Sequence, residues 1–322
     1  MIPYTWLEQA AERINGHIQK TPLTYDPNND LYLKWENHQV TGSFKARGAL
    51  NKVLTLEKWE LQRGLVTASA GNHGQGLALA GKLVQAPVVI FASDHAVPSK
   101  IEAMKSLGAQ VKLVPGGYND AEQAGLEYAA AHTMTWVSPY NDGQVIAGQG
   151  TLGLETLMEL PGLPQSVWVV PVGGGGLISG IGAAIKTHSA AGDCALIGVQ
   201  SEASPFGYSL YHEGSQEGVI ELPSLADGLA GGIQRDSLTI PLMRRYLDDF
   251  VLVSEQAIAD AIRYAWNRYQ EILEGAAAAA LAAVLSGKVD GRPAVVILSG
   301  GNIQSQRHAE ITAGATPTQA DG

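Results

Sequence analysis

Two spacings of apolar residues divide the chain into predicted strands and helices. Residues 31–36 read Leu-Tyr-Leu-Lys-Trp-Glu, the alternation of apolar and polar side chains that is typical of a strand. In residues 46–56 the apolar side chains recur at the three- and four-residue spacing of a helix. Residues 294–298 form a short, continuous apolar run, which predicts a strand buried on both faces.

Strand and helix patterns alternate over almost the whole chain. The other predicted strands cover residues 64–69, 88–92, 110–114, 134–137, 166–172, 196–200 and 250–253. The other predicted helices cover residues 5–14, 75–83, 99–107, 119–132, 150–160, 177–186, 255–269 and 276–285. Residues 21–23 are expected to form a turn, and residues 204–234, rich in Gly, Ser and Pro, to form irregular loops at a functional site. This order predicts an α/β protein with parallel sheets.

Composition and charge narrow the class of protein. A chain of 322 residues, 45% of them hydrophobic and 16% charged, is expected to fold into two globular domains. The net charge of −10 disfavours nucleic acid and anionic membranes as partners. Cys194 is the only cysteine, so no intramolecular disulfide forms. Because residues 1–8 show no leader pattern and no long apolar run follows, we expect a cytoplasmic protein.

Four consecutive glycines separate the apolar run 166–172 from the helix pattern 177–186: Gly173, Gly174, Gly175 and Gly176. Glycines let several backbone N–H groups turn toward one anion, at a helix N-terminus that favours negative charge. A close-packed turn is the alternative, but four glycines lose more chain entropy than such a turn requires. The run therefore predicts a phosphate site.

A second glycine pattern, residues 148–153, reads Gly-Gln-Gly-Thr-Leu-Gly and matches the fingerprint of dinucleotide-binding proteins. However, no strong strand precedes it, and no acidic residue ends the strand that follows. We interpret it as the start of a helix that packs near the functional cleft and joins the two domains.

Two more turns follow predicted strands. Residues 69–74 read Ser-Ala-Gly-Asn-His-Gly, and these small and amide residues make a nest suited to a carboxylate. Residues 298–302 read Leu-Ser-Gly-Gly-Asn and lie at the carboxyl edge of a sheet, where ligands bind in open α/β folds. Ordinary polar turns are the alternative in both places, and His73 alone is more often structural than catalytic.

Lys45 follows the loop 37–42 and precedes the helix pattern 46–56. We expect partial desolvation and nearby positive charge, from the helix N-terminus and Arg47, to lower its pKa. A lowered pKa favours the free amine that Schiff-base chemistry needs. A lysine exposed in the first turn of a helix is the alternative, and on spacing alone it is the simpler one.

Residues 33–37 (Leu-Lys-Trp-Glu-Asn) and 41–49 (Thr-Gly-Ser-Phe-Lys-Ala-Arg-Gly-Ala) together resemble the cofactor-lysine signature of pyridoxal-phosphate enzymes of fold type II. Within that group they are most similar to threonine/serine dehydratases and serine racemases. The resemblance implies two open, parallel-sheet domains of three layers, as in the tryptophan synthase β subunit. The large domain would comprise residues 1–50 and 140–322, and the small one residues 51–139. Residues 313–322 are expected to be a disordered tail.

The resemblance also implies roles for single residues. Lys45 would hold pyridoxal 5'-phosphate covalently, Asn72 would contact its 3-oxygen, and Ser299 would hydrogen-bond its pyridine nitrogen. The residues implied to contact the cofactor are Phe44, Lys45, Asn72, Gly173, Gly174, Gly175, Gly176, Leu177, Gly228, Glu274, Ser299 and Gly300. Those implied to contact the substrate are Ser69, Ala70, Gly71, Asn72 and His73. For Glu274 the alternative is that it only complements the dipole of the following helix.

Three departures from the family pattern bear on function. Ala70 stands where serine racemases usually carry a serine, which acts as acid and base on the face of the substrate opposite the cofactor lysine. The methyl group of Ala70 cannot move a proton. Gly275 replaces a proline that follows the glutamate at 274 in the family. Gln200 stands where a glutamate often begins a cation site, and Phe206 supplies no ligand, so we predict no tight divalent metal site.

The implied reaction is β-elimination of L-threonine, L-serine or both, giving a 2-oxo acid and ammonia, with Lys45 removing the α-proton. This would make the protein a threonine/serine ammonia-lyase. The alternatives are a serine racemase, a lyase for another β-substituted amino acid, and a non-catalytic binder of a phosphorylated ligand. The expected partners are a small amino acid and further copies of the chain, as a homodimer or a higher homo-oligomer.

Overall fold

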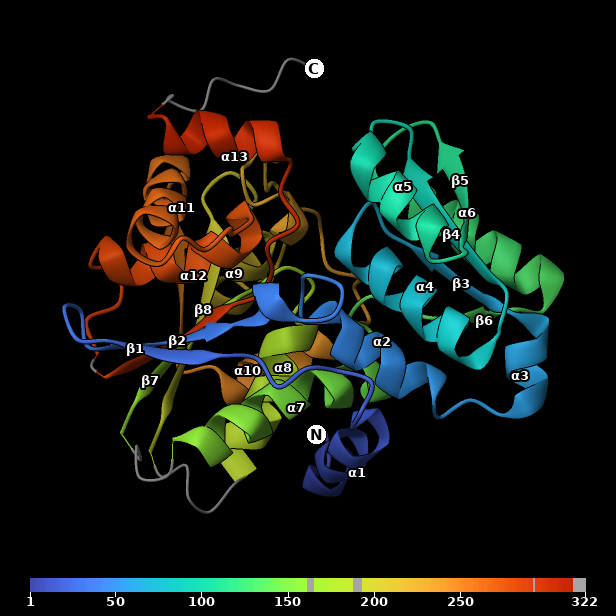
Figure 1. Ribbon diagram of the computed structural model, residues 1–322, viewed down its shortest axis with the longest axis horizontal. Coiled ribbons are helices and arrows are strands. Elements are labelled where there is room, and N and C mark those ends of the chain that lie inside the picture. The colour runs from blue at the N-terminus through green and yellow to red at the C-terminus, as the bar shows by residue number, and fades with distance from the viewer. Residues whose placement is uncertain (161–164, 188–192, 292, 315–322) are drawn as a thin grey trace.

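The computed structural model describes residues 1–160, 165–187, 193–291 and 293–314, which form two sheets flanked by helices (Figure 1). Within these residues the larger sheet has six strands in the order β1-β2-β10-β7-β8-β9. They are β1 (Leu23–Asp26), β2 (Leu31–Trp35), β10 (Ala294–Leu298), β7 (Val167–Pro171), β8 (Ala195–Ser201) and β9 (Asp249–Val253). All neighbours are parallel except β1 and β2, which are antiparallel.

Helices cover both faces of the larger sheet because alternate side chains of its strands point to opposite faces. Trp168 and Val170 face one apolar cluster, whereas Val169 faces the other. The first face is covered by α1 (Tyr4–Ile14), α7 (Gly143–Glu159), α8 (Gly176–Thr187) and α10 (Thr239–Tyr246). The second face is covered by α11 (Glu255–Tyr269) and α12 (Gly275–Leu285), and α13 (Ser305–Thr312) packs on α11. The result is a three-layer domain.

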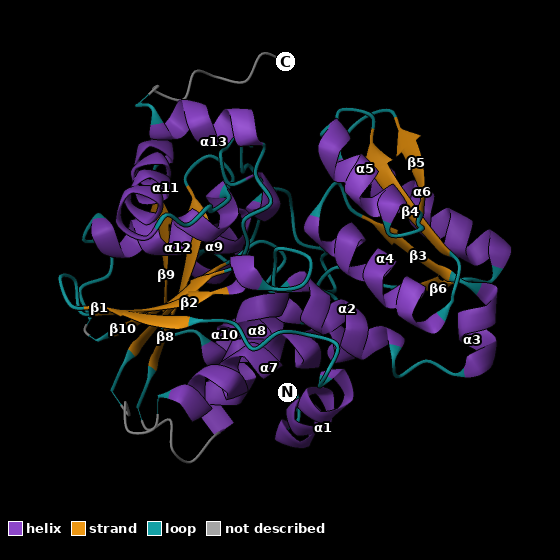
Figure 2. Cartoon of the chain, viewed as in Figure 1, coloured by secondary structure: helices purple, strands orange, loops and turns teal. Residues whose placement is uncertain are grey.

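The smaller sheet has four parallel strands in the order β5-β4-β3-β6 within the described residues. They are β5 (Gln110–Val114), β4 (Val88–Ser93), β3 (Leu65–Ala68) and β6 (Thr135–Trp136). The helices grouped around it in Figure 2 are α2 (Lys45–Val53), α3 (Lys58–Arg63), α4 (Asn72–Val84), α5 (Pro98–Ser106) and α6 (Tyr118–His132). The predicted α/β class with parallel sheets in two domains is confirmed.

The domain limits at residues 50/51 and 139/140 stay a prediction. Helix α2, which contains the first limit, contacts both domains. Its buried side chains Leu50 and Val53 share an apolar cluster with Leu65 and Leu77 of the smaller domain. The same helix also packs against α7. A limit at residues 50/51 therefore falls inside one helix that contacts both domains.

Several elements differ from the sequence prediction. The expected turn at 21–23 leads directly into the edge strand β1, whose four residues are too short to show a clear alternation. The short helices α3, α10 and α13 were not predicted, and α9 (Phe206–His212) and the 3-10 turn η2 (Asp227–Leu229) interrupt the expected loops at 204–234. Of the predicted disordered tail, only residues 313 and 314 are described, and 315–322 lie outside the described residues.

The glycine pattern at 148–153 is not the start of a helix, so that expectation was wrong. Helix α7 begins at Gly143, because the Asp142 side chain accepts hydrogen bonds from the backbone N–H groups of Gln144 and Val145. Gly148 instead lies mid-helix, where an added Cβ would be 2.7 Å from the carbonyl oxygen of Arg47. The pattern serves close packing of α7 against α2 and α8.

None of the helices that the structure describes combines the length and the apolar character needed to cross a bilayer.

Candidate active site

A cleft of about 570 Å³ lies where the carboxyl ends of both sheets meet. Strand ends from each sheet contribute to its wall, including Ala68 of β3, Ser93 of β4 and Pro171 of β7. This is where open α/β sheets bind ligands. Every residue predicted to contact cofactor or substrate lines the cleft, with the exception of Gly300.

The amine of Lys45 lies in an enclosed part of the cleft. Its Nζ donates a hydrogen bond to the carbonyl oxygen of Pro139, at 2.9 Å, and lies 5.2 Å from the centre of the Phe44 ring. Burial lowers the pKa of Lys45 to about 8, and the nearby Glu274 carboxyl opposes this shift. The amine is therefore partly unprotonated close to neutral pH, as the sequence predicted.

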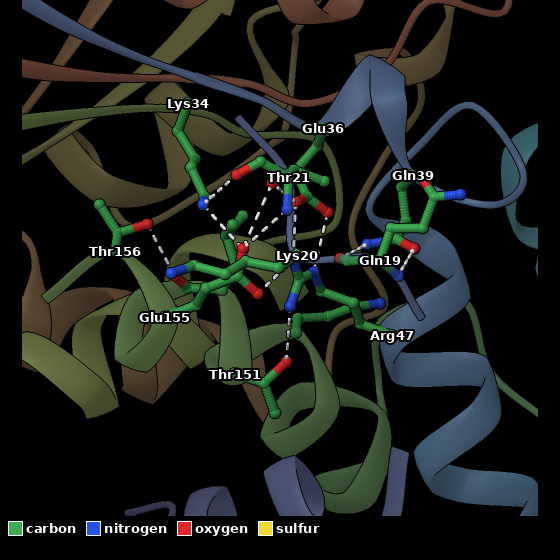
Figure 3. Close-up of polar contacts among 12 residues, drawn as sticks. Gln19, Lys20, Thr21, Lys34, Glu36, Gln39, Arg47, Thr151, Glu155 and Thr156 are labelled. Atoms are coloured by element: carbon green, nitrogen blue, oxygen red, sulfur yellow. Dashed lines mark hydrogen bonds and ion pairs between the residues drawn. The ribbon is translucent and has the colours of Figure 1, made fainter. Parts of the chain in front are cut away.

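Arg47 is not the cause of that lowered pKa, so this part of the expectation was wrong. Its guanidinium points away into a buried network (Figure 3) and donates to both carboxyl oxygens of Glu36, each at 2.8 Å. It also reaches Glu155, at 2.9 Å, and Lys34 contacts the same carboxylate at 2.7 Å. The network joins β2 and α7 to the first turn of α2, the helix that begins at Lys45.

The four glycines form the turn between β7 and α8. Gly175 has φ +83°, a conformation that other residues rarely adopt. A Cβ on Gly174 would lie 2.3 Å from the Tyr140 ring, so this glycine is also required by packing. Because α8 begins at Gly176, the first N–H groups of that helix have no acceptor within the helix. They face the same cleft as Lys45 and are free to bind an anion.

Asn72 and Glu274 form a polar bridge across the cleft. The Asn72 amide donates to Glu274 Oε1 at 2.7 Å, and its Oδ1 accepts a hydrogen bond from Asn302 at 2.7 Å. Asn302 also donates to the carbonyl oxygen of Thr41, at 2.8 Å. Asn302 thus fixes the Asn72 amide with its NH₂ group directed at Glu274. Sequence reasoning placed Asn302 in a ligand-binding turn but gave it no role.

The carboxyl group of Glu274 is buried. Burial raises its pKa to about 7, against the opposing effects of Lys100 and Asn72, while Asp227 adds to the rise. Glu274 precedes α12, but its side chain makes no capping hydrogen bond to that helix. The position of Glu274 therefore favours a role in the cleft over the alternative that it only complements the dipole of α12.

Residues 69–73, at the junction of β3 and α4, line the cleft. Ser69 Oγ accepts a hydrogen bond from the backbone N–H of Gly71, at 3.1 Å, and Ala70 is exposed to the cleft. His73 is buried, and its Nε2 bonds the carbonyl oxygen of Val137 at 3.1 Å. Burial, with Lys45 nearby, lowers the pKa of His73 to about 3. The ring is therefore neutral, and in this position it fixes the turn against β6.

The turn after β10 packs against the segment that precedes Lys45. The Phe44 N–H donates to the Ser299 carbonyl oxygen at 3.0 Å, and the Gly301 N–H donates to the Gly42 carbonyl oxygen at 2.9 Å. Ser299 lines the cleft. Gly300 lies behind it, where an added Cβ would be 2.5 Å from Glu274 Oε1. Its glycine is explained by packing around Glu274.

Gln200 makes three hydrogen bonds within the protein. Its Oε1 accepts from the backbone N–H groups of Gly207 and Tyr208, at 2.9 and 3.2 Å, and its Nε2 donates to the Leu229 carbonyl oxygen at 3.3 Å. Across the part of the chain that the structure describes, no three His, Cys, Asp or Glu side chains are grouped so that they could hold a metal ion.

Comparison with known proteins adds to this geometry. Residues 14–300 match the model of the family described as pyridoxal-phosphate dependent enzymes. The chain is 42% identical over 311 residues to an L-threonine ammonia-lyase of Thermotoga maritima, covering 94% of this chain and 76% of that protein. A threonine deaminase of Solanum lycopersicum has a similar structure (TM-score 0.85, 29% identity, 97% and 94% of the two chains covered). So has a maize serine racemase (TM-score 0.85, 29% identity, 95% of each chain covered).

Proposed function

The chain belongs to the family of pyridoxal-phosphate dependent enzymes, and from this premise we propose that it deaminates L-threonine, L-serine or both. The products would be a 2-oxo acid and ammonia. The observation that carries the proposal is an enclosed Lys45 amine, with a pKa of about 8, in one cleft with the four-glycine turn. A non-catalytic phosphate binder has no use for such an amine.

The residues of the cleft fit a phosphorylated pyridine aldehyde. Lys45 supplies an amine for the aldehyde, and the turn from Gly173 to Gly176 supplies backbone donors for the phosphate. Asn72 presents an NH₂ group from the opposite domain, and Ser299 supplies a hydroxyl at the end of β10. The other assigned cofactor contacts, Phe44, Leu177, Gly228, Glu274 and Gly300, belong to the same proposal.

The cofactor, when bound, supplies an electron sink that acidifies the Cα–H bond of the substrate. Lys45 Nζ then takes the Cα proton, and its lowered pKa keeps enough of the amine free to do so near neutral pH. Ser69, Gly71 and the neighbouring backbone N–H groups hold the substrate carboxylate. The C–O bond to the β-hydroxyl breaks, and the hydroxyl leaves as water with one proton gained, which balances the proton that Lys45 removed from Cα. The released enamine takes up water to give the 2-oxo acid and ammonia.

Ala70 favours elimination over racemisation. Racemisation needs a proton donor on the face opposite Lys45, and the methyl group of Ala70 cannot supply one. The structural similarity to a serine racemase keeps racemisation as the second candidate. Its test is the release of the D-enantiomer from L-serine.

The remaining proposals concern the whole protein. We propose domain limits at residues 50/51 and 139/140, a cytoplasmic location and a homodimer or higher homo-oligomer. The two separate sheets support the domain limits. A single cysteine, which is typical of a reducing compartment, supports the cytoplasmic location. The assembly rests on the family resemblance alone, and light scattering of the purified protein measures it.

The proposed reaction is tested by a substrate panel. Release of 2-oxo acid is measured with L-threonine, L-serine, D-serine and L-2,3-diaminopropionate, and serine from the reaction is analysed for chirality. We expect turnover of L-threonine or L-serine, and loss of turnover in Lys45→Ala. Lys105→Ala, which removes an exposed lysine of α5, is the control and keeps full activity. Activity in Lys45→Ala equal to the wild type would contradict the proposal.

A further inference from the structure

Lys100 of α5 crosses the cleft from the smaller domain to the larger one. Its Nζ lies 3.0 Å from Asp227 Oδ2, and its side chain is only 16% exposed, whereas that of Asp227 is 59% exposed. The stem of Lys100 runs over the carboxylate nest. A Cβ built on Gly71 would be 3.3 Å from Lys100 Cδ and 3.7 Å from Nζ. The ammonium group therefore lies between Asp227 and the loop assigned to the substrate carboxylate.

The charges around the cleft explain why a cation is needed there. Among the described residues that line it, four are carboxylic acids: Asp120, Glu221, Asp227 and Glu274. The lysines and arginines of the same lining are Lys45 and Lys100 alone. Lys45 is committed to the cofactor under the proposed function. The α-carboxylate of a zwitterionic amino acid therefore enters an acidic cleft, in whose described lining Lys100 is the remaining lysine or arginine that can offset the charge of that carboxylate.

The position of Lys100 in its helix is not explained by helix stability. It is the third residue of α5, and the N-terminus of a helix disfavours a cation. Its partner Asp227 is largely exposed, so solvent screens the ion pair and limits what it adds to stability. Neither contact gives a strong structural reason for a lysine at this position, whereas a ligand in the nest would.

We propose that Lys100 is a substrate-binding residue whose ammonium group leaves Asp227 to pair with the α-carboxylate of the amino acid held by the 69–73 turn. Asp227 competes with the substrate for this cation. The inference rests on the proposed function for the identity of the substrate. It adds a side chain to a carboxylate site otherwise built from Ser69 and backbone N–H groups.

Competition between Asp227 and the substrate predicts opposite effects of two substitutions. Lys100→Met removes the cation and raises the KM for L-threonine about tenfold or more, because an ion-assisted hydrogen bond is lost. Asp227→Asn removes the competitor and lowers the KM. Asparagine keeps an Oδ1 to accept the Gly228 N–H, which bonds the Asp227 side chain at 2.8 Å. Because Lys100 binds and moves no proton, kcat stays within about twofold in both variants.

Lys105→Met is the matched control. It removes the same charge from the same helix at an exposed position, where Lys105 pairs with Glu102. Its KM should equal that of the wild type. If Lys100 and Asp227 only bridge the domains, the two substitutions shift KM in the same direction, and that result would overturn the proposal. An unchanged KM in Lys100→Met, or a large loss in kcat, would also overturn it.

Calorimetric titration of the holoenzyme separates this proposal from the proposed function. L-2-Aminobutyrate has no β-hydroxyl and cannot eliminate, and its amide lacks the carboxylate. We expect Lys100→Met to weaken binding of the acid about tenfold or more and to leave binding of the amide unchanged. Equal weakening of both ligands contradicts a carboxylate contact. If the wild type released no 2-oxo acid from L-threonine, the proposed function would fail, while this binding difference would still decide the role of Lys100.

Discussion

Lys45, which is partly buried, and Glu274, which is buried, are ionisable groups whose pKa values both move toward neutrality. Burial disfavours the charged form of each, which lowers the pKa of the amine to about 8 and raises that of the carboxyl to about 7. Such shifts are common at active sites, where a group must gain or lose a proton at working pH. Lys45 fits the role of a base, and Glu274 can hold a proton beside Asn72.

The raised pKa of Glu274 makes the cofactor-free protein less stable as pH rises. The folded state holds this proton up to about pH 7, whereas an unfolded glutamate releases it near 4.5. The stabilisation from this group is therefore complete below pH 4.5 and is lost as pH rises through 7, by about 3 kcal/mol in total. Glu274→Gln should remove this loss. The difference in thermal midpoint between the variant and the wild type should therefore be more positive at pH 8 than at pH 5. A pH-independent difference would contradict the raised pKa.

Ala70 is predicted to limit the reaction to elimination. Ala70→Ser places a hydroxyl at an exposed position of the cleft, opposite the face served by Lys45 in the proposed mechanism. We expect the variant to release D-serine from L-serine at a rate above that of the wild type, measured by chiral chromatography. Ala70→Gly, which adds no hydroxyl, is the control. D-Serine release that is equal in all three proteins would show that residue 70 does not decide between the reactions.

The residue scale also shows the limits of sequence reasoning. Lys45 and the four glycines could be found because each is a local pattern with a chemical meaning. Lys100 and Asn302 could not be given roles, because their partners Asp227 and Asn72 lie 127 and 230 residues away in the chain. The influence of Arg47 on Lys45 was predicted from sequence proximity, but its charge is engaged by Glu36 and Glu155.

At the scale of elements, α2 determines the position of Lys45, which is its first residue. Arg47 ties the first turn of α2 to Glu36, the residue that follows β2, and to α7 through Glu155 (Figure 3). Both Arg47 and Glu36 are fully buried. Burial would raise the pKa of Glu155, but Arg47 and Lys34 outweigh it and hold that pKa below its usual value. The contacts fix the beginning of α2 relative to both neighbouring elements.

Arg47→Met is predicted to lower the free energy of unfolding by about 3–5 kcal/mol, because it leaves the buried carboxylate of Glu36 without its cationic partner. Urea unfolding followed by circular dichroism measures this loss. The double variant Glu36→Gln/Arg47→Met removes the unpaired charge and should regain part of the stability. If the loss of stability in the double variant equals the sum of the losses in Glu36→Gln and Arg47→Met, the two residues are not directly coupled.

Element boundaries were predictable where one signal dominated. The strand at 294–298 and the helix at 255–269 were predicted with the bounds that the structure shows, because an apolar run and a strong helical period define them. The start of α7 was placed at residue 150 because the glycine pattern at 148–153 was interpreted as the start of a helix. The Asp142 cap was the correct signal, and close packing against α2 explains the glycines.

At the scale of the whole molecule, the cofactor is predicted to hold the two domains together. Asn72 comes from α4 of the smaller domain, and the four-glycine turn follows β7 of the larger one, yet both line one cleft. A ligand that contacts both should stabilise the folded state by about 4 kcal/mol at a thousandfold excess over its Kd.

Removal of pyridoxal phosphate should therefore lower the thermal midpoint by roughly 5–10 °C, as measured by calorimetry. In Lys45→Ala the rise on adding the cofactor should be smaller, because the phosphate contacts remain while the covalent bond is lost. A midpoint that is the same with and without cofactor in the wild type would contradict a site shared by the two domains.

Attachment of the cofactor to Lys45 is tested most directly by borohydride reduction of the purified enzyme, followed by proteolysis and mass spectrometry. Reduction converts the bond between the lysine and pyridoxal phosphate into a stable amine. We expect one modified peptide, which contains Lys45 and carries the mass of the reduced cofactor. An unmodified Lys45 peptide, or a modification on another lysine such as Lys100, would contradict it.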